Sequence, residues 1–252
     1  MESANDSDTG AASGGRARAM VSIAVLVALC AAASLAFGRV RRSSVYRLRL
    51  GSPAERVDAI RASTYAARSV ALERIAPMLK DPSPEVRRAA VAALEDLAAR
   101  EESWRVTWHC ANDSDAGVRE KACRFAGAFA DDRHVPAVAA ALDDPEPAVR
   151  AEAVTALAAL GAKQSRKPVA GLLEDHDERV RAAAIRALGE IGTHDEVPFL
   201  VARLGLEEEV DKSVILSSLV SLTGTNQGLD PKRWWRWLEL KEWGAIPEEP
   251  GE

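Results

Sequence analysis

The feature that most constrains this chain is a segment that occurs twice. The stretches DDPEPAVRAEAVTALAALG and EDHDERVRAAAIRALGEIG start at residues 143 and 174, so every matching position is 31 residues apart. A fixed offset of this size is typical of stacked helical hairpins, in which each unit buries its apolar face against its neighbours. The offset therefore predicts an all-α solenoid rather than a globular domain with one central core.

An apolar stripe accompanies the repeat. Anchor valines recur every 30 to 32 residues, at Val86, Val118, Val149, Val180 and Val210. Apolar residues follow the first four anchors at offsets of 5, 8 and 11, which lie on one face of an α-helix. Each repeat is therefore expected to begin with an amphipathic helix. In the last repeat serines replace apolar residues at offsets 8 and 11, so we expect the stripe to weaken there.

Glycine and proline mark the ends of these helices. Gly161 and Gly192 stand just past the stripe, where a residue in the left-handed conformation commonly ends a helix. A second helix is expected to follow, because Pro136, Pro168 and Pro198 occupy positions suited to a first helical turn. Aromatic residues make up only 5% of the chain and the apolar residues are mostly small, which suits helices that pack closely.

The pattern D-x4-V-R-x2-A-x-x-A-L-x-x-[LI]-G, followed by a helix that starts at proline, resembles the HEAT-like repeats of phycobilisome lyases. The resemblance covers residues 53–222, with a degenerate first repeat. It implies a right-handed α-solenoid of about five to six helical hairpins. It also implies a polar ladder between repeats, made by the turn aspartate and the arginine after the valine: Asp81, Arg87, Asp113, Arg119, Asp144, Arg150, Asp175 and Arg181. We interpret these residues as structural, because a contact that recurs in every unit is what stacking requires.

The segment 223–244 departs from the repeat. Its sequence indicates a loop, a helix that starts after Asp230, and a crowd of tryptophans at Trp234, Trp235, Trp237 and Trp243. It resembles the endings of many bacterial HEAT-like proteins. Two interpretations are open: the indoles close the apolar end of the solenoid, or they anchor a partner peptide together with neighbouring arginines. We favour the cap.

The N-terminal region predicts a membrane anchor. Residues 1–19 are polar and are expected to be a disordered tail, as are residues 245–252. Residues 20–38 include 18 successive uncharged residues, which predicts one transmembrane helix ahead of the solenoid. The basic juxtamembrane linker 39–52 that follows favours an inner-membrane protein with its C-terminal domain in the cytoplasm. Export after signal cleavage is the alternative, because small-x-small motifs lie near the end of the apolar segment.

Residues with catalytic or metal-binding chemistry form no recognisable motif. The four histidines fall in different repeats, at His109, His134, His176 and His194, and the three cysteines include no C-x-x-C pair. A net charge of -5 argues against general nucleic-acid binding. We therefore expect no enzyme activity, no metal and no cofactor.

The leading hypothesis is a membrane-anchored scaffold that binds a protein partner on its concave face. The resemblance implies one alternative, a bilin lyase subunit or a regulator of such an enzyme. The sequence leaves the identity of the partner and the oligomeric state open.

Overall fold

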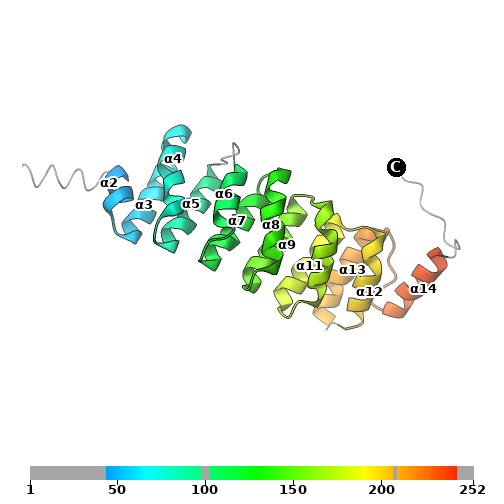
Figure 1. Ribbon diagram of the computed structural model, residues 1–252. Helices are drawn as coiled ribbons and strands as arrows, with labels where there is room; N and C mark the ends of the chain where they lie inside the picture. Colours follow the sequence, from blue (N-terminus) through cyan, green and yellow to red (C-terminus); the bar gives the residue numbers. More distant parts are fainter. Residues whose placement is uncertain (1–43, 98–102, 207–208, 243–252) are drawn as a thin grey trace, which may run out of the picture.

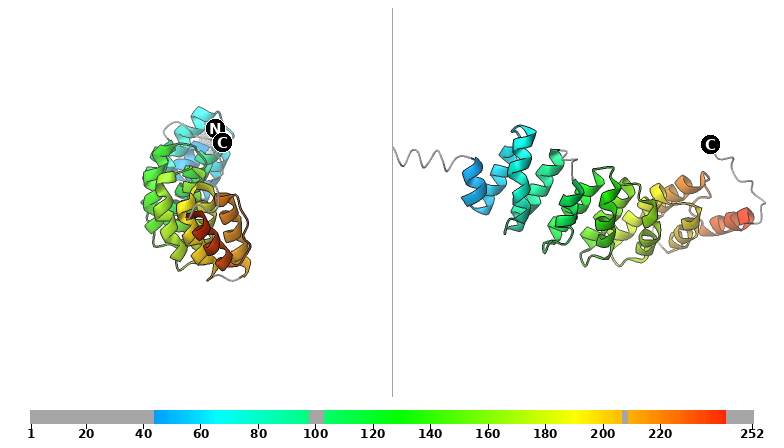
Figure 2. Two further views of the ribbon diagram at one scale, coloured as in Figure 1. Left: turned by 90° about the vertical axis from the view of Figure 1, so that its right-hand side faces the viewer. Right: turned by 45° about the horizontal axis from the view of Figure 1, so that its top comes forward.

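A computed structural model of the protein describes residues 44–97, 103–206 and 209–242. Within these ranges all regular structure is helical, and the helices follow one another in a single row from α2 to α14 (Figure 1). Seen along the row, the C-terminal repeats are displaced from the N-terminal ones, so the row is not straight (Figure 2). The all-α solenoid predicted from the repeat is confirmed.

Several segments named above lie outside the described residues. These are the two tails, 1–19 and 245–252, and the apolar segment 20–38. In the part of the chain that the structure covers, no helix has the length and apolarity needed to span a membrane.

The described helices after α2 alternate between two sets, which we call first helices and second helices. The first helices are α3 (Pro53–Ser63), α5 (Pro84–Asp96), α7 (Ala116–Gly127), α9 (Pro147–Ala159), α11 (Glu178–Ile191) and α13 (Glu209–Thr223). The second helices are α4 (Arg68–Ile75), α6 (Ser103–Cys110), α8 (Val135–Ala140), α10 (Arg166–Gly171), α12 (Val197–Leu204) and α14 (Pro231–Glu242). Short 3₁₀ turns flank most second helices: η1 (Ala76–Lys80), η2 (Asp132–His134), η3 (Ala141–Asp143), η4 (Lys163–Ser165), η5 (Leu172–Glu174) and η6 (His194–Glu196).

The helices form two layers. First helices pack on one another from repeat to repeat, as α7 does on α9 and α9 on α11. Most second helices pack against the first helix of the next repeat, as α10 does on α11 and α12 on α13. The anchor valines of α5, α7, α9 and α11 are fully buried, so the predicted stripe is the seam between the layers. The buried apolar residues form two clusters, one from α2 to the α7 repeat and one from α7 to α14, and each spans several repeats. Each repeat therefore depends on its neighbours.

The weakening of the stripe in α13 was expected, but the structure shows a close helix contact there. Ser218 Oγ donates a hydrogen bond to the Ile185 carbonyl at 2.9 Å, and Ser221 Oγ donates to the Gly189 carbonyl at 2.8 Å. A Cβ atom on Gly189 would lie 2.7 Å from Ser218 Oγ. The serines and the glycine therefore let α11 and α13 approach closely, and the hydroxyls satisfy carbonyls that a larger side chain would cover.

The two helix-ending glycines differ. Gly161 adopts the left-handed conformation with φ 64°, as predicted. For Gly192 the prediction is wrong, because its φ is -70° and its ψ is 178°. A Cβ atom at Gly192 would collide with the Leu188 carbonyl oxygen. Glycine is needed at this position for space and not for a positive φ.

The prediction of a linker over residues 39–52 is wrong for its second half. Residues Ser44–Leu50 form helix α2, which packs on α3 and buries Leu48. The first repeat has no preceding repeat to cover its apolar end, and α2 supplies that cover.

Candidate functional site

Bidentate ion pairs join successive repeats along the turns. In each pair the arginine Nε and Nη2 atoms donate to the two carboxylate oxygens at 2.6 to 2.8 Å; the pairs are Arg87–Asp113, Arg119–Asp144 and Arg150–Asp175. Each arginine also donates through Nη1 to the carbonyl oxygen of the aspartate in its own turn. One guanidinium therefore ties two turns together.

The aspartates also shape their own turns. Asp175 Oδ1 accepts a hydrogen bond from the backbone N–H of Asp177 at 2.8 Å, and the equivalent bond occurs in the other turns of the ladder. The hydrogen bond from Arg150 lowers the pKa of the Asp175 carboxyl and outweighs the effect of its burial. The carboxylate is thus held ionised by its partner.

The ladder starts one repeat earlier than the sequence pattern indicated. Arg56 Nη2 donates to Asp81 Oδ1 at 2.8 Å across 25 residues, the same separation as between Arg150 and Asp175. The valine-arginine motif does not reveal Arg56, because in α3 the arginine precedes Val57 instead of following a valine. The 25-residue spacing to Asp81 was the available signal. At the other end, Arg181 Nη1 donates to the Asp175 carbonyl at 3.1 Å.

Two of the tryptophans in α14 lie in the core. Trp234 is fully buried and Trp237 is 6% exposed, and both belong to the apolar cluster that runs through the C-terminal repeats. Trp234 Nε1 donates a hydrogen bond to the Gly228 carbonyl at 2.8 Å, and the two indole rings meet edge to face. Trp235 points outward and is 42% exposed. Trp243 lies outside the described residues.

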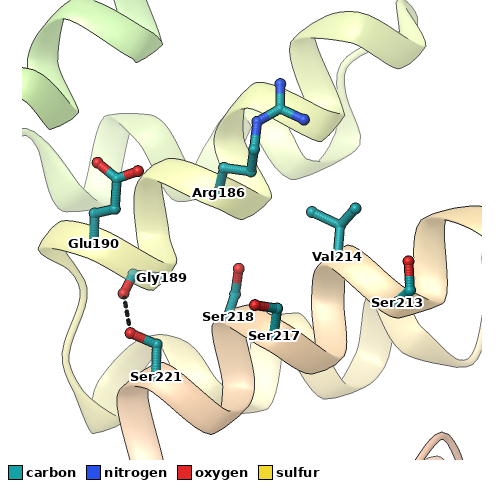
Figure 3. Close-up of a pocket in the computed structure, with 8 residues that line it drawn as sticks. All are labelled: Arg186, Gly189, Glu190, Ser213, Val214, Ser217, Ser218 and Ser221. Atoms are coloured by element: carbon teal, nitrogen blue, oxygen red, sulfur yellow. Dashed lines mark hydrogen bonds between the residues drawn. The ribbon is translucent and has the colours of Figure 1, made fainter.

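The exposed side chains of the first helices form a second surface, which we call the first-helix face. A groove of about 370 Å³ lies on it between α11 and α13 (Figure 3). Arg186 and Glu190 lie on the α11 side of this groove, and Val214 and four serines lie on the α13 side: Ser213, Ser217, Ser218 and Ser221. The groove combines hydroxyl groups with one exposed charge of each sign.

A larger groove of about 690 Å³ lies at the other end of the first-helix face, between α3 and α5. Alanines of α5 line its floor, and Arg88 and Lys121 line its rim. Tyr65 stands beside it with 92% of its surface exposed. An exposed aromatic side chain next to a groove of small residues is a favourable contact for a partner chain.

His134 is a buried polar residue that the sequence did not single out. Its ring nitrogens meet the hydroxyls of Ser103 and Thr107 at 3.1 and 2.8 Å, and the ring stacks on Phe129. Burial lowers the pKa of His134, with opposing contributions from the nearby charges of Asp131 and Arg133. This cluster fastens α6 to the next repeat. The other three histidines lie on the exposed surface.

His134 should make the stability of the protein depend on pH. The folded-state pKa of His134 lies below the ordinary value of 6.5. The stability that the buried neutral ring contributes is therefore complete above that value and is lost as the pH falls below it. We expect the urea midpoint to drop between about pH 7.5 and 5.5 and the drop to shrink in His134→Gln. His176→Gln, in an exposed turn, is the control. Equal pH slopes in all three proteins would contradict the assignment.

The two described cysteines are free and buried, and burial raises the pKa of Cys110 and of Cys123 to about 12. Such thiols are poor nucleophiles at neutral pH. Among the residues covered by the structure, no group of three or more His, Cys, Asp or Glu side chains is placed to hold a metal ion.

Comparisons with known proteins agree with this architecture. Among solved structures, the chain is similar to a designed armadillo repeat protein in complex with the peptide (KR)4, with 19% identity, 71% of this chain and 97% of that chain covered, and a TM-score of 0.53. It is also similar to the complex of CpcE and CpcF of phycocyanin lyase from Nostoc sp. PCC7120, with 20% identity, 79% and 92% covered, and a TM-score of 0.52. These likenesses show the fold.

A search of the curated proteins found no match. The family model for HEAT repeats matches residues 72–147, 105–169 and 135–220, which together span more than half of the 252 residues. The chain therefore belongs to the HEAT-repeat family.

Proposed function

We propose that the protein is a non-catalytic HEAT-repeat scaffold that binds a protein partner along the first-helix face, the side that we expect to be concave. The observation that carries this proposal is the pair of grooves between neighbouring first helices, one at each end of that face. Extended surfaces of this kind are what helical solenoids use for binding. The designed armadillo neighbour, solved with a peptide, supports the same mode of use.

The middle of the first-helix face suits an extended partner segment. Small side chains such as Ala151 and Thr155 line α9 there, so a partner backbone could approach closely. Charges border this track: Arg124 donates to Glu120 and to Glu152 at 3.0 to 3.2 Å across α7 and α9. Half-exposed ion pairs of this type contribute little stability but add specificity for a complementary partner.

The proposal includes a membrane location. Residues 20–38 act as a single transmembrane helix of the inner membrane, and the arginines after them keep the HEAT repeats in the cytoplasm. The length and charge of this segment support an anchor over a cleaved signal, since a dense basic cluster beyond a cleavage site impedes translocation.

Partner binding should be lost when a bulky charge is placed on the first-helix face. Thr155 is exposed on α9, and Thr155→Arg should weaken capture of the native partner from membranes about tenfold or more. Ala140→Arg places the same side chain on exposed α8 in the other layer and should leave binding unchanged. Quantitative mass spectrometry of affinity-purified full-length chains provides the measurement. Loss of binding in Ala140→Arg alone would move the partner site to the second-helix layer.

The alternative is a bilin lyase subunit or a regulator of one. The structural likeness to the CpcE–CpcF complex favours this candidate, although at 20% identity that likeness shows the fold alone. A tetrapyrrole that co-purifies with the full chain, or accelerated bilin transfer in its presence, would select the alternative over the scaffold.

A further inference from the structure

Positive and negative charges are distributed unevenly between residues 39–80 and residues 81–252. Residues 39–80 contain 10 Lys or Arg and 3 Asp or Glu, whereas residues 81–252 contain 21 and 32. The N-terminal end of the row of repeats is therefore basic, although the whole chain has a net charge of -5. A charge asymmetry of this kind reports on the partner that each end meets.

The basic end carries a groove between α2 and α4, which lie together at one end of the row (Figure 1). Its volume is about 360 Å³. The charged residues of its lining are Arg49, Glu73 and Arg74. The rest of the lining is apolar: Leu48, Val70, Pro77 and Met78. Leu50, next to Arg49, is 72% exposed. This end thus pairs exposed apolar surface with an excess of positive charge.

The length of the connecting chain limits how far this end can lie from the bilayer. Helix α2 begins at Ser44, and only residues 39–43 separate it from the proposed transmembrane helix. Even a fully extended connection of this length spans no more than about 20 Å. Basic residues that close to an anionic leaflet are attracted to it, each by roughly fivefold in the bound-to-free ratio.

We propose that the N-terminal end of the solenoid, helices α2 and α4 with the groove between them, docks on anionic lipid headgroups. Arg49 and Arg74 contact the headgroups, and Leu50 and the apolar groove residues lie at the level of the interface. The first repeat is then fixed against the membrane, and the acidic remainder of the row is repelled from the same surface. The first-helix face is thereby kept clear of the bilayer for its partner. This inference rests on the proposed membrane anchor.

The test uses the full chain in nanodiscs of phosphatidylcholine alone or mixed with phosphatidylglycerol, each with a headgroup spin label as quencher. A fluorophore is placed through Ser69→Cys on exposed α4, or through Ser217→Cys on exposed α13 as the matched control. Cys30→Ser removes one competing thiol, and Cys110 and Cys123 are buried with pKa values of about 12. We expect salt-sensitive quenching at position 69 in the anionic discs and unchanged emission at position 217.

Charge variants decide whether the arginines cause the docking. Arg49→Glu with Arg74→Glu should lower the ratio of docked to free protein at least about 25-fold. Arg49→Lys with Arg74→Lys should retain docking. Lys163→Glu with Lys167→Glu, two exposed positions in a later repeat, should leave the docked fraction unchanged. Circular dichroism melting of each variant separates loss of docking from loss of folding. Equal quenching in both lipid mixtures would overturn the proposal.

A second chain in the groove is a separate outcome. Efficient energy transfer between Ser69→Cys labels on two copies, without lipid quenching, would overturn the lipid proposal in favour of self-association. The membrane anchor is tested independently by washing membrane vesicles that contain the full-length protein with alkaline carbonate. Release of the chain by carbonate refutes the anchor alone, and salt-sensitive recruitment of that released chain to anionic vesicles would still support docking.

Discussion

The double substitution Trp234→Ala and Trp237→Ala is expected to lower the free energy of unfolding by several kcal/mol. Truncation of one buried tryptophan costs about 3 to 5 kcal/mol, because the transfer of a large apolar surface is lost and a cavity remains. Trp234 is fully buried and also donates a hydrogen bond to Gly228, so its loss leaves that carbonyl unsatisfied. The two rings touch, so the two effects are not additive.

The measurement is urea unfolding followed by circular dichroism, with Trp235→Ala as the control. Trp235 lies between the two buried residues on the same helix but is 42% exposed, so its truncation should cost much less. If α14 closes the solenoid, the double variant should also aggregate, because the apolar face of α12 is uncovered. Unchanged stability of the double variant together with loss of the partner would establish the tryptophans as a binding anchor.

The repeat period carried most of the fold because one contact pattern is used in every unit. The anchor valines lie in equivalent environments in each repeat, and so do the turn aspartates. One alignment of two segments therefore locates the seam, the turns and the second helices. Arg87, Arg119 and Arg150 each bind the aspartate of the following turn, so the polar contacts run between successive repeats. The same logic misses Arg56, because the first repeat keeps the spacing but not the motif.

Features specific to one repeat could not be read in this way. The burial of His134 arises from Ser103 and Thr107, which lie 31 and 27 residues earlier in a repeat that lacks the usual glycine and proline. The contact between Gly189 and Ser218 depends on how closely α11 and α13 approach, which a hydropathy pattern does not encode. Helix α2 is stabilised by packing on the exposed end of the array, and its seven residues are too few to show a helical periodicity in the sequence.

The grooves on the first-helix face also could not be predicted from the sequence. Several of their lining residues, such as Arg88, Arg186 and Glu190, lie off the stripe, where the repeat imposes no identity. Ser218 and Ser221 line one groove from stripe positions at which serine replaces an apolar residue. The position of Thr155 is occupied by Ala92, Arg124, Arg186 and Leu216 in the other repeats, while the anchor position is valine in each of them. A binding surface on a solenoid is therefore located by its architecture, and its specificity resides in residues that carry no repeat signal.

Removal of one rung of the ladder tests whether the ion pairs stabilise the stack. Arg150→Ala removes two charge-assisted hydrogen bonds to Asp175 and the bond to the Asp144 carbonyl. The side chains of Arg150 and Asp175 are only 16% and 7% exposed, so solvent screens this pair weakly. We expect a loss of about 1 to 3 kcal/mol in the free energy of unfolding. Because repeats are coupled through their interfaces, the repeats on either side of Arg150 should unfold at a lower urea concentration than in the unmodified protein.

Arg179 provides the matched control, since it also pairs with an aspartate at 3.0 Å but is 71% exposed. Arg179→Ala should leave the free energy of unfolding nearly unchanged, because a solvent-exposed ion pair contributes little stability. Arg150→Lys should recover only part of the loss, because an ammonium group cannot make the bidentate contact. Equal stability of Arg150→Ala and the unmodified protein would show that stacking rests on the apolar seam alone.

The pH dependence of this difference supplies an independent check. The pKa of Asp175 is lowered below its ordinary value of 3.8, so the contribution of the pair is complete above that value and is lost as the pH falls below it. The gap in stability between Arg150→Ala and the unmodified protein should therefore narrow under acid conditions and remain constant near neutrality. A gap that persists in acid would instead reflect lost packing of the arginine stem, because the apolar part of that side chain is buried at every pH.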